Sequence, residues 1–174
     1  ETSISRLKAA AAQSAPAEQR RPAICQFTAD GAPLDVLVAE DNPVNQMVIR
    51  AMLEKLGCSV RMAGDGLSAV EAYKSAPPAI VLMDISMPEV DGIEATAMIR
   101  KIQEDVGRRT PIIGVTAQAL REDRRRCIDA GMDDYLPKPV KEAALHDILD
   151  RWSPRSRGER AASLSRRVGQ RGAP

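Results

Sequence analysis

Short apolar runs alternate along the middle of this chain with stretches in which apolar residues recur every three or four positions. The runs predict strands, and the recurring stretches predict helices. The predicted strands are Leu34–Ala39, Cys58–Met62, Ala79–Asp84, Pro111–Thr116 and Asp133–Leu136. A helix follows each strand, and the predicted helices cover 43–56, 65–75, Ile93–Glu104, Leu120–Ala130 and Lys141–Trp152.

The first, third and fourth of these strands are continuously apolar. Such strands are buried on both faces, which is typical of a parallel sheet covered by helices on each side. Five strand–helix units with right-handed connections predict an α/β fold, a flavodoxin-like doubly wound (βα)5 sandwich. We expect its parallel five-stranded sheet to have the order 2-1-3-4-5.

The first helix begins at a clear signal, since Asn42 is a favourable N-cap and Pro43 suits the first helical position. Gly57 ends it. A core-facing stripe is predicted at Val44, Val48, Met52 and Leu56. Met47 and Ile49 lie off this stripe, where they are either exposed and able to dock a helical partner or buried at its flank.

The net charge of +1 hides an uneven distribution. Residues 153–174 carry six arginines and one glutamate, whereas 34–152 carry 15 basic and 20 acidic residues. We expect 1–33 to be a flexible linker, 34–152 one domain, and 153–174 a disordered basic tail without an assigned function. The balance argues against a protein whose whole surface binds nucleic acid or an acidic membrane.

The three cysteines, Cys25, Cys58 and Cys127, are far apart and form no CxxC pair, which favours a reduced, cytoplasmic compartment. No apolar stretch approaches the roughly 20 residues of a membrane span, and no signal-peptide pattern opens the chain. Because the first residue is Glu1, we expect the chain to be a fragment of a longer protein or a processed form.

Chemistry-bearing residues follow the carboxyl ends of the predicted strands. Glu40 and Asp41 follow the first strand, Asp84 ends the third, Thr116 ends the fourth and Lys138 follows the fifth. Taken alone, each of these residues has an ordinary structural interpretation, such as a turn former, a strand residue or a solvated charge. Ligands of doubly wound folds bind at this edge, where clustered carboxylates need a cation. Oxygen-only ligands favour Mg²⁺ or Mn²⁺, and Asp84 is placed to be the nucleophile of a phosphoryl transfer.

Four stretches, VLVAEDNPVNQMVIRAMLEKLG, VLMDISMPEVDGIEAT, PIIGVTAQA and GMDDYLPKPV, resemble the receiver domain of two-component response regulators. The resemblance covers Leu34 to Trp152, in order and at normal spacing. The forms EDNPVNQ and MDISMPEVDG are most similar to receivers of hybrid sensor histidine kinases. The resemblance therefore implies a phosphoacceptor domain of a phosphorelay, as the C-terminal receiver of a hybrid kinase.

The resemblance also implies a role for each site residue. Asp84 would accept the phosphoryl group. Asp41, Asp84 and the backbone carbonyl of Ser86 would bind Mg²⁺ directly, and Glu40 mainly through water. Thr116 and Lys138 would contact the phosphoryl group, with a cis bond before Pro139, and the Tyr135 rotamer would follow Thr116 on activation. Ala117 would leave the phosphate room to enter, and Ser86 and Gln118 would tune the dephosphorylation rate.

The expected partner is a histidine kinase or a histidine-phosphotransfer domain that carries phosphohistidine, with no nucleic acid and no direct membrane contact. Two alternatives stay open: a stand-alone response regulator, and a binding-only module that is not phosphorylated. A dehalogenase-type phosphatase would need a second Asp where Ser86 stands. The chain has no P-loop motif and no kinase catalytic core, and its single histidine is His146.

The predicted helix Leu120–Ala130 has a thin apolar face made of Leu120, Cys127 and Ile128. It follows the strand that ends in Thr116. Because few buried contacts leave a helix locally unstable, we expect it to be the mobile output element, with an ordinary solvated helix as the alternative. Hydrogen exchange with and without a phosphoryl mimic separates the two.

Overall fold

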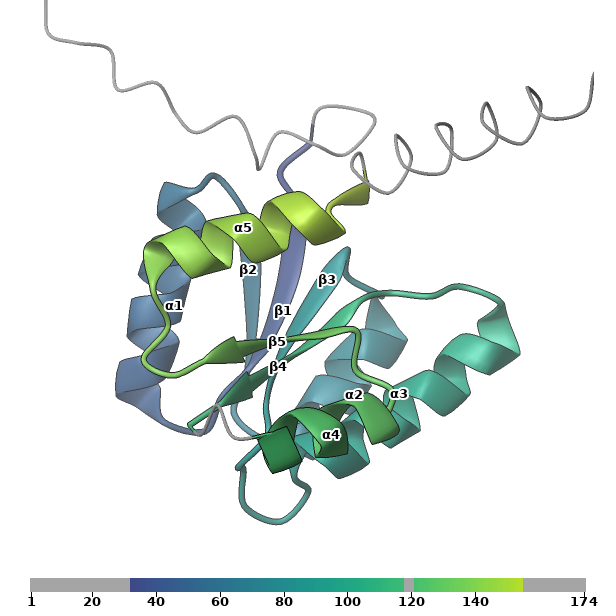
Figure 1. Cartoon of the computed structure of the whole chain (residues 1–174). Coiled ribbons are helices and arrows are strands. Elements are labelled where there is room, and N and C mark those ends of the chain that lie inside the picture. Colours follow the sequence, from purple (N-terminus) through teal and green to yellow (C-terminus); the bar gives the residue numbers. More distant parts are fainter. Residues whose placement is uncertain (1–31, 118–120, 155–174) are drawn as a thin grey trace, which may run out of the picture.

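The computed structural model describes residues 32–117 and 121–154, and these form alternating strands and helices (Figure 1). The elements are β1 (Asp35–Ala39), α1 (Pro43–Lys55), β2 (Ser59–Ala63), α2 (Gly66–Ser75), β3 (Ile80–Asp84), α3 (Gly92–Val106), β4 (Ile112–Thr116), α4 (Arg121–Asp129), β5 (Asp134–Pro137) and α5 (Glu142–Trp152). All ten correspond to predicted elements, with boundaries that differ by one or two residues. Among the described residues, no helix is long and apolar enough to span a membrane.

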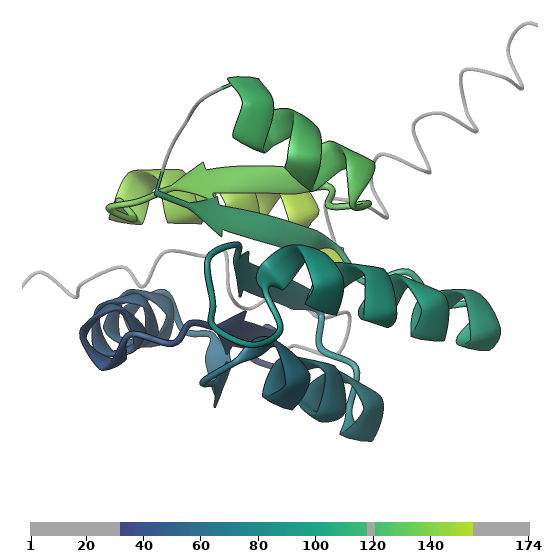
Figure 2. The same cartoon turned by 90° about the horizontal axis from the view of Figure 1, so that it is seen from below.

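The five strands form one parallel sheet in the order β2-β1-β3-β4-β5, which confirms the predicted topology. The central strands β3 and β4 are buried at every position. Helices α1 and α5 cover one face of the sheet, and α2, α3 and α4 cover the other (Figures 1 and 2). Each face has its own apolar core, so the strand ends at one edge are held by packing from both sides.

Helix α1 corrects the predicted core stripe. Its N-cap is Asn42, whose side chain accepts hydrogen bonds from the backbone N–H groups of Val44 and Asn45, as predicted. Of the predicted stripe, Leu56 is buried and Met52 packs partly buried against the core, but Val44 and Val48 are exposed. Ile49 and Leu53 are buried instead. Both sets have helical spacing, so periodicity alone does not choose between them. In the structure the polar Asn45 begins the inward face, and Ile49, Leu53 and Leu56 continue it.

Helix α4 agrees with its prediction only in part. Cys127 is buried against the sheet, but Ile128 is 58% exposed and does not belong to an apolar face. Leu120 and Gln118 lie outside the described residues. The role of this helix as the output element stays a prediction.

The start of β5 is tied to the end of α5 through the carboxylate of Asp134. It accepts hydrogen bonds from Trp152 Nε1 at 3.0 Å, Arg151 Nη1 at 2.7 Å and its neighbour Tyr135 N at 2.9 Å. Burial acts to raise the pKa of Asp134, but these three donors outweigh it and hold the pKa below its usual value.

A lowered carboxyl pKa predicts a pH-dependent contribution to stability. It is fully present above the unfolded-state value of about 3.9 and is lost as the pH falls through the lower folded-state pKa. Asp134→Asn is therefore expected to lower the free energy of unfolding by about 1–2 kcal/mol at pH 7, and by progressively less below about pH 3.9. Urea unfolding at a series of pH values measures this, with the exposed Asp105→Asn as the control. An Asp134→Asn effect that does not vary with pH would contradict it.

Candidate functional site

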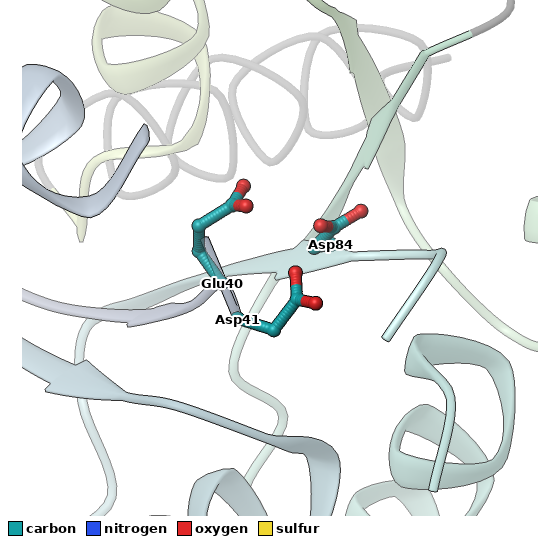
Figure 3. A group of neighbouring side chains, drawn as sticks. All are labelled: Glu40, Asp41 and Asp84. Carbon is teal, nitrogen blue, oxygen red and sulfur yellow. The ribbon is translucent and has the colours of Figure 1, made fainter. Parts of the chain in front are cut away.

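Three carboxylates meet at the carboxyl ends of β1 and β3 (Figure 3). Glu40 and Asp41 directly follow β1, and Asp84 is the last residue of β3. One oxygen of each lies within 4.8 Å of the others. Glu40 and Asp84 are 1% and 2% exposed, whereas Asp41 is exposed. The strands β1 and β3 are neighbours in the sheet, which is why residues more than 40 positions apart come together.

Lys138 lies against the two buried carboxylates. It follows β5, and its Nζ is 2.7 Å from both Asp84 Oδ2 and Glu40 Oε2. The Oε2 atom of Glu40 is buried and accepts no well-directed hydrogen bond from the described residues, so its contact with Lys138 is an ion pair. The Lys138–Pro139 peptide bond is cis, as the resemblance implies.

The electrostatics of this cluster favour a further cation. Burial raises the pKa of Asp84 although Lys138 and the Ser86 N–H favour its ionised form. Burial acts to lower the pKa of Lys138, but contacts with Asp84 and Glu40 outweigh it and raise that pKa. The cluster thus holds three carboxylates, and the Lys138 ammonium pairs with two of them. Carboxylate oxygens at this spacing suit a hard divalent cation, and the chemistry of this donor set fits Mg²⁺.

The remaining predicted site residues are placed around the same edge of the sheet. Thr116, at the end of β4, is buried, and its carbonyl accepts a hydrogen bond from Lys138 N at 2.7 Å. The Ser86 N–H donates to Asp84 Oδ1 at 3.0 Å. Tyr135 is half-buried on β5 beside Gly114 of β4. Gln118 lies outside the described residues.

Two residues of the site were not predicted from the sequence. Asn45 Nδ2 donates to Glu40 Oε1 at 3.0 Å, and Gln46 Nε2 donates to the Glu40 backbone carbonyl at 2.6 Å. The sequence signal that could have identified them is a pair of adjacent amide side chains in the first turn of the helix, five and six residues after Glu40. That spacing brings them back over the end of β1.

Gly92 makes the end of β3 that carries Asp84 sensitive to substitution. A Cβ at Gly92 would lie 2.0 Å from the carbonyl oxygen of Asp84, a backbone atom that cannot rotate away. Gly92→Ala is therefore expected to lower the free energy of unfolding by about 2–3 kcal/mol. Gly64→Ala is the matched control, because a Cβ there meets only the end of the Gln46 side chain, at 4.0 Å. Equal urea midpoints for the two variants would contradict the expected clash.

Comparison with known proteins gives the family. The family model described as "Response regulator receiver domain" matches residues 36–150. The signal transduction histidine-protein kinase BarA of Escherichia coli (strain K12) is 40% identical over 123 residues, which cover 71% of this chain and 13% of that protein. The hybrid signal transduction histidine kinase I of Dictyostelium discoideum is 41% identical over 123 residues, 68% of this chain and 7% of that protein. The chain thus spans about a tenth of these curated relatives.

Solved structures agree with this assignment. The receiver domain of sensor histidine kinase PA1611 from Pseudomonas aeruginosa PAO1, crystallised with a magnesium ion coordinated in its active site cleft, is 50% identical with a TM-score of 0.64, over 70% of this chain and 98% of that chain. The co-crystal structure of the Saccharomyces cerevisiae phosphotransfer protein Ypd1 and the receiver domain of Ssk1 matches with a TM-score of 0.66 and 32% identity, over 69% of this chain and 88% of that chain. The strand order, the carboxylate cluster and the family match lead to one conclusion: this chain belongs to the response regulator receiver domain family.

Proposed function

We propose that Asp84 accepts a phosphoryl group from a phosphohistidine on a partner protein, with Mg²⁺ bound at the carboxylate cluster. The observation that carries this is the Asp84 carboxylate, fixed at the end of a buried strand with Lys138 Nζ 2.7 Å away. A carboxylate oxygen attacks phosphorus, the P–N bond of phosphohistidine breaks, and the imidazole leaves with the bonding electron pair. The product is an acyl phosphate on Asp84.

The residues around Asp84 have distinct proposed roles. Asp41, Asp84 and the Ser86 carbonyl would hold Mg²⁺ directly and Glu40 through water. The ion would neutralise charge on the phosphoryl oxygens and orient them for in-line attack. The oxygen-only donor set supports Mg²⁺ as the ion and also admits Mn²⁺.

Lys138 and Thr116 would contact the transferred group after it arrives. The Lys138 ammonium would pair with a phosphoryl oxygen, and the Thr116 hydroxyl would donate a hydrogen bond to another. Tyr135 would then change rotamer as Thr116 moves inward. These movements would transmit the conformational change caused by phosphorylation to the surface formed by α4 and β5.

The exposed side of α1 is the proposed docking surface for the phosphohistidine partner. Val44 and Met47 are 64% and 69% exposed, and Val48 is exposed beside them. An apolar groove continues from Val48 to Pro139 and Val140, and Lys138 forms part of its lining. A helix laid on this surface would place its histidine near Asp84. The Ypd1 and Ssk1 receiver co-crystal supports a phosphotransfer protein as the occupant.

The relatives support a hybrid histidine kinase as the parent protein. The C-terminal receiver is the proposed position of this domain within it. A stand-alone response regulator is the alternative, and the size of the natural gene product on an immunoblot separates the two. The cytoplasm is the proposed compartment, since the three cysteines are far apart in the sequence and form no CxxC pair.

Intact-mass spectrometry tests the proposed function directly. Incubation with Mg²⁺ and a small acyl-phosphate donor is expected to add one phosphoryl group, which Asp84→Asn abolishes. The exposed Asp147→Asn is the matched control and should be phosphorylated as the wild type is. A folded wild-type chain that takes no phosphoryl group would favour the binding-only alternative.

A further inference from the structure

Helix α1 fixes the orientation of the Glu40 side chain. Glu40 Oε1 accepts two hydrogen bonds, from Asn45 Nδ2 at 3.0 Å and from the Asn42 N–H at 3.2 Å. The Gln46 amide holds the backbone of the same residue. One carboxylate oxygen of Glu40 is therefore fully engaged on the helix side.

The second oxygen faces the carboxylate cluster as a result. Glu40 Oε2 is buried, accepts no well-directed hydrogen bond from the described residues and lies 2.7 Å from Lys138 Nζ. The terminal torsion of a glutamate is broad and nearly two-fold, so burial alone does not fix the plane of the carboxylate. The hydrogen bonds from the Asn42 N–H and from Asn45 Nδ2 supply this constraint, and the Asn45 bond is the one that a side-chain substitution can remove.

We propose that Asn45 is a positioning residue of the metal site, which holds Glu40 so that Oε2 faces the cation or its water. The inference rests on the proposed function, because it concerns the same site. Groups that orient metal ligands in this way typically change metal affinity by about 10–100-fold when removed. Asn45 is half-buried and lines the groove beside Val48, so leucine fits its place while removing the donor.

Isothermal titration with Mg²⁺ tests the proposal without any phosphoryl transfer. Asn45→Leu is expected to weaken Mg²⁺ binding by about 10-fold or more. The loss should not exceed that of Glu40→Ala, since Asn45 acts through Glu40. A loss larger than that of Glu40→Ala would overturn the proposed route.

Gln103→Leu is the matched control for a purely structural effect. Gln103 is also a side-chain amide on a helix, but it is buried and its Nε2 donates to the Thr110 carbonyl at the opposite edge of the sheet. This variant is expected to lower the free energy of unfolding and leave the Mg²⁺ dissociation constant within about twofold. If Asn45→Leu behaves in the same way as Gln103→Leu, the positioning role is wrong.

The outcomes for the two proposals can be told apart. If the wild type binds Mg²⁺ and is phosphorylated on Asp84, but Asn45→Leu binds Mg²⁺ as tightly as the wild type, the positioning role alone falls. If the folded wild type neither binds Mg²⁺ nor accepts a phosphoryl group, the proposed function is wrong, and so is the positioning role of Asn45 that rests on it.

Discussion

Replacing Arg100 by methionine is expected to lower the free energy of unfolding by about 3–5 kcal/mol. The Arg100 guanidinium on α3 is 12% exposed and forms a largely buried ion pair with Asp133, Nη2 to Oδ2, at 2.6 Å. It also donates to the Gly131 carbonyl at 2.8 Å and to the Thr110 carbonyl at 2.9 Å. Removal of the guanidinium takes the ion-pair partner at 2.6 Å from Asp133 and the Arg100 donor from the Gly131 carbonyl. The Thr110 carbonyl loses one of two donors and keeps Gln103 Nε2.

The size of this effect depends on what remains around Asp133. Arg109 Nη2 still pairs with Asp133 Oδ1 at 2.8 Å, and the Ile112 N–H donates to Oδ2 at 2.9 Å. Arg109 is 68% exposed, so its charge is screened by solvent and replaces little of the buried pair.

Urea unfolding measures the difference, and Lys55→Met is the matched control. Lys55 pairs with Glu142 at 2.8 Å, but both side chains are substantially exposed. A change below about 1 kcal/mol is expected there. Equal effects of the two substitutions would show that burial of the Arg100–Asp133 pair contributes nothing, which contradicts the argument.

The strand order and the position of the site could be predicted because both depend on patterns local in sequence. Continuous apolar runs mark the buried strands, and parallel strands bring their carboxyl ends to one edge. The rule that the carboxyl ends of parallel strands lie at one edge predicts, without any distance, that one site contains four residues. These are Glu40, Asp41, Asp84 and Lys138. The structure brings them together at that edge as expected.

The orientation of α1 could not be predicted, because two apolar stripes with the same spacing overlap in its sequence. In the structure, polar and apolar contacts agree on one orientation, since Asn45 bonds to Glu40 while Ile49 and Leu53 are buried. The Arg100–Asp133 ion pair could not be predicted from the sequence for a different reason. Its partners are 33 positions apart, and each looks like an ordinary surface charge in sequence.

Lys138 connects the stability of the site with its chemistry. Its ammonium lies between the two buried carboxylates, at 2.7 Å from each. It therefore neutralises part of the negative charge that would attract a bound cation. The same ammonium is the group proposed to pair with the transferred phosphoryl oxygens. Substitution of Lys138 should therefore separate metal binding from phosphoryl transfer.

Lys138→Met is expected to slow phosphorylation of Asp84 by about 10²–10³-fold, because a fixed charge facing the developing phosphoryl charge is lost. Mg²⁺ binding is expected to be at least as tight as in the wild type, since the variant leaves Glu40 and Asp84 without their ammonium. The metal-free variant should be less stable than the wild type, and Mg²⁺ should restore much of the difference by binding the folded state.

Three measurements on the same variant decide this prediction: the rate of adduct formation by mass spectrometry, the Mg²⁺ affinity by titration calorimetry, and urea unfolding with and without Mg²⁺. The exposed Lys141→Met, three residues further along, is the control and should match the wild type in all three. A parallel loss of Mg²⁺ affinity and rate in Lys138→Met would mean that Lys138 maintains the shape of the metal site. An unchanged rate would remove Lys138 from the phosphoryl-transfer step, because the charge it places 2.7 Å from Asp84 would then be irrelevant to the reaction.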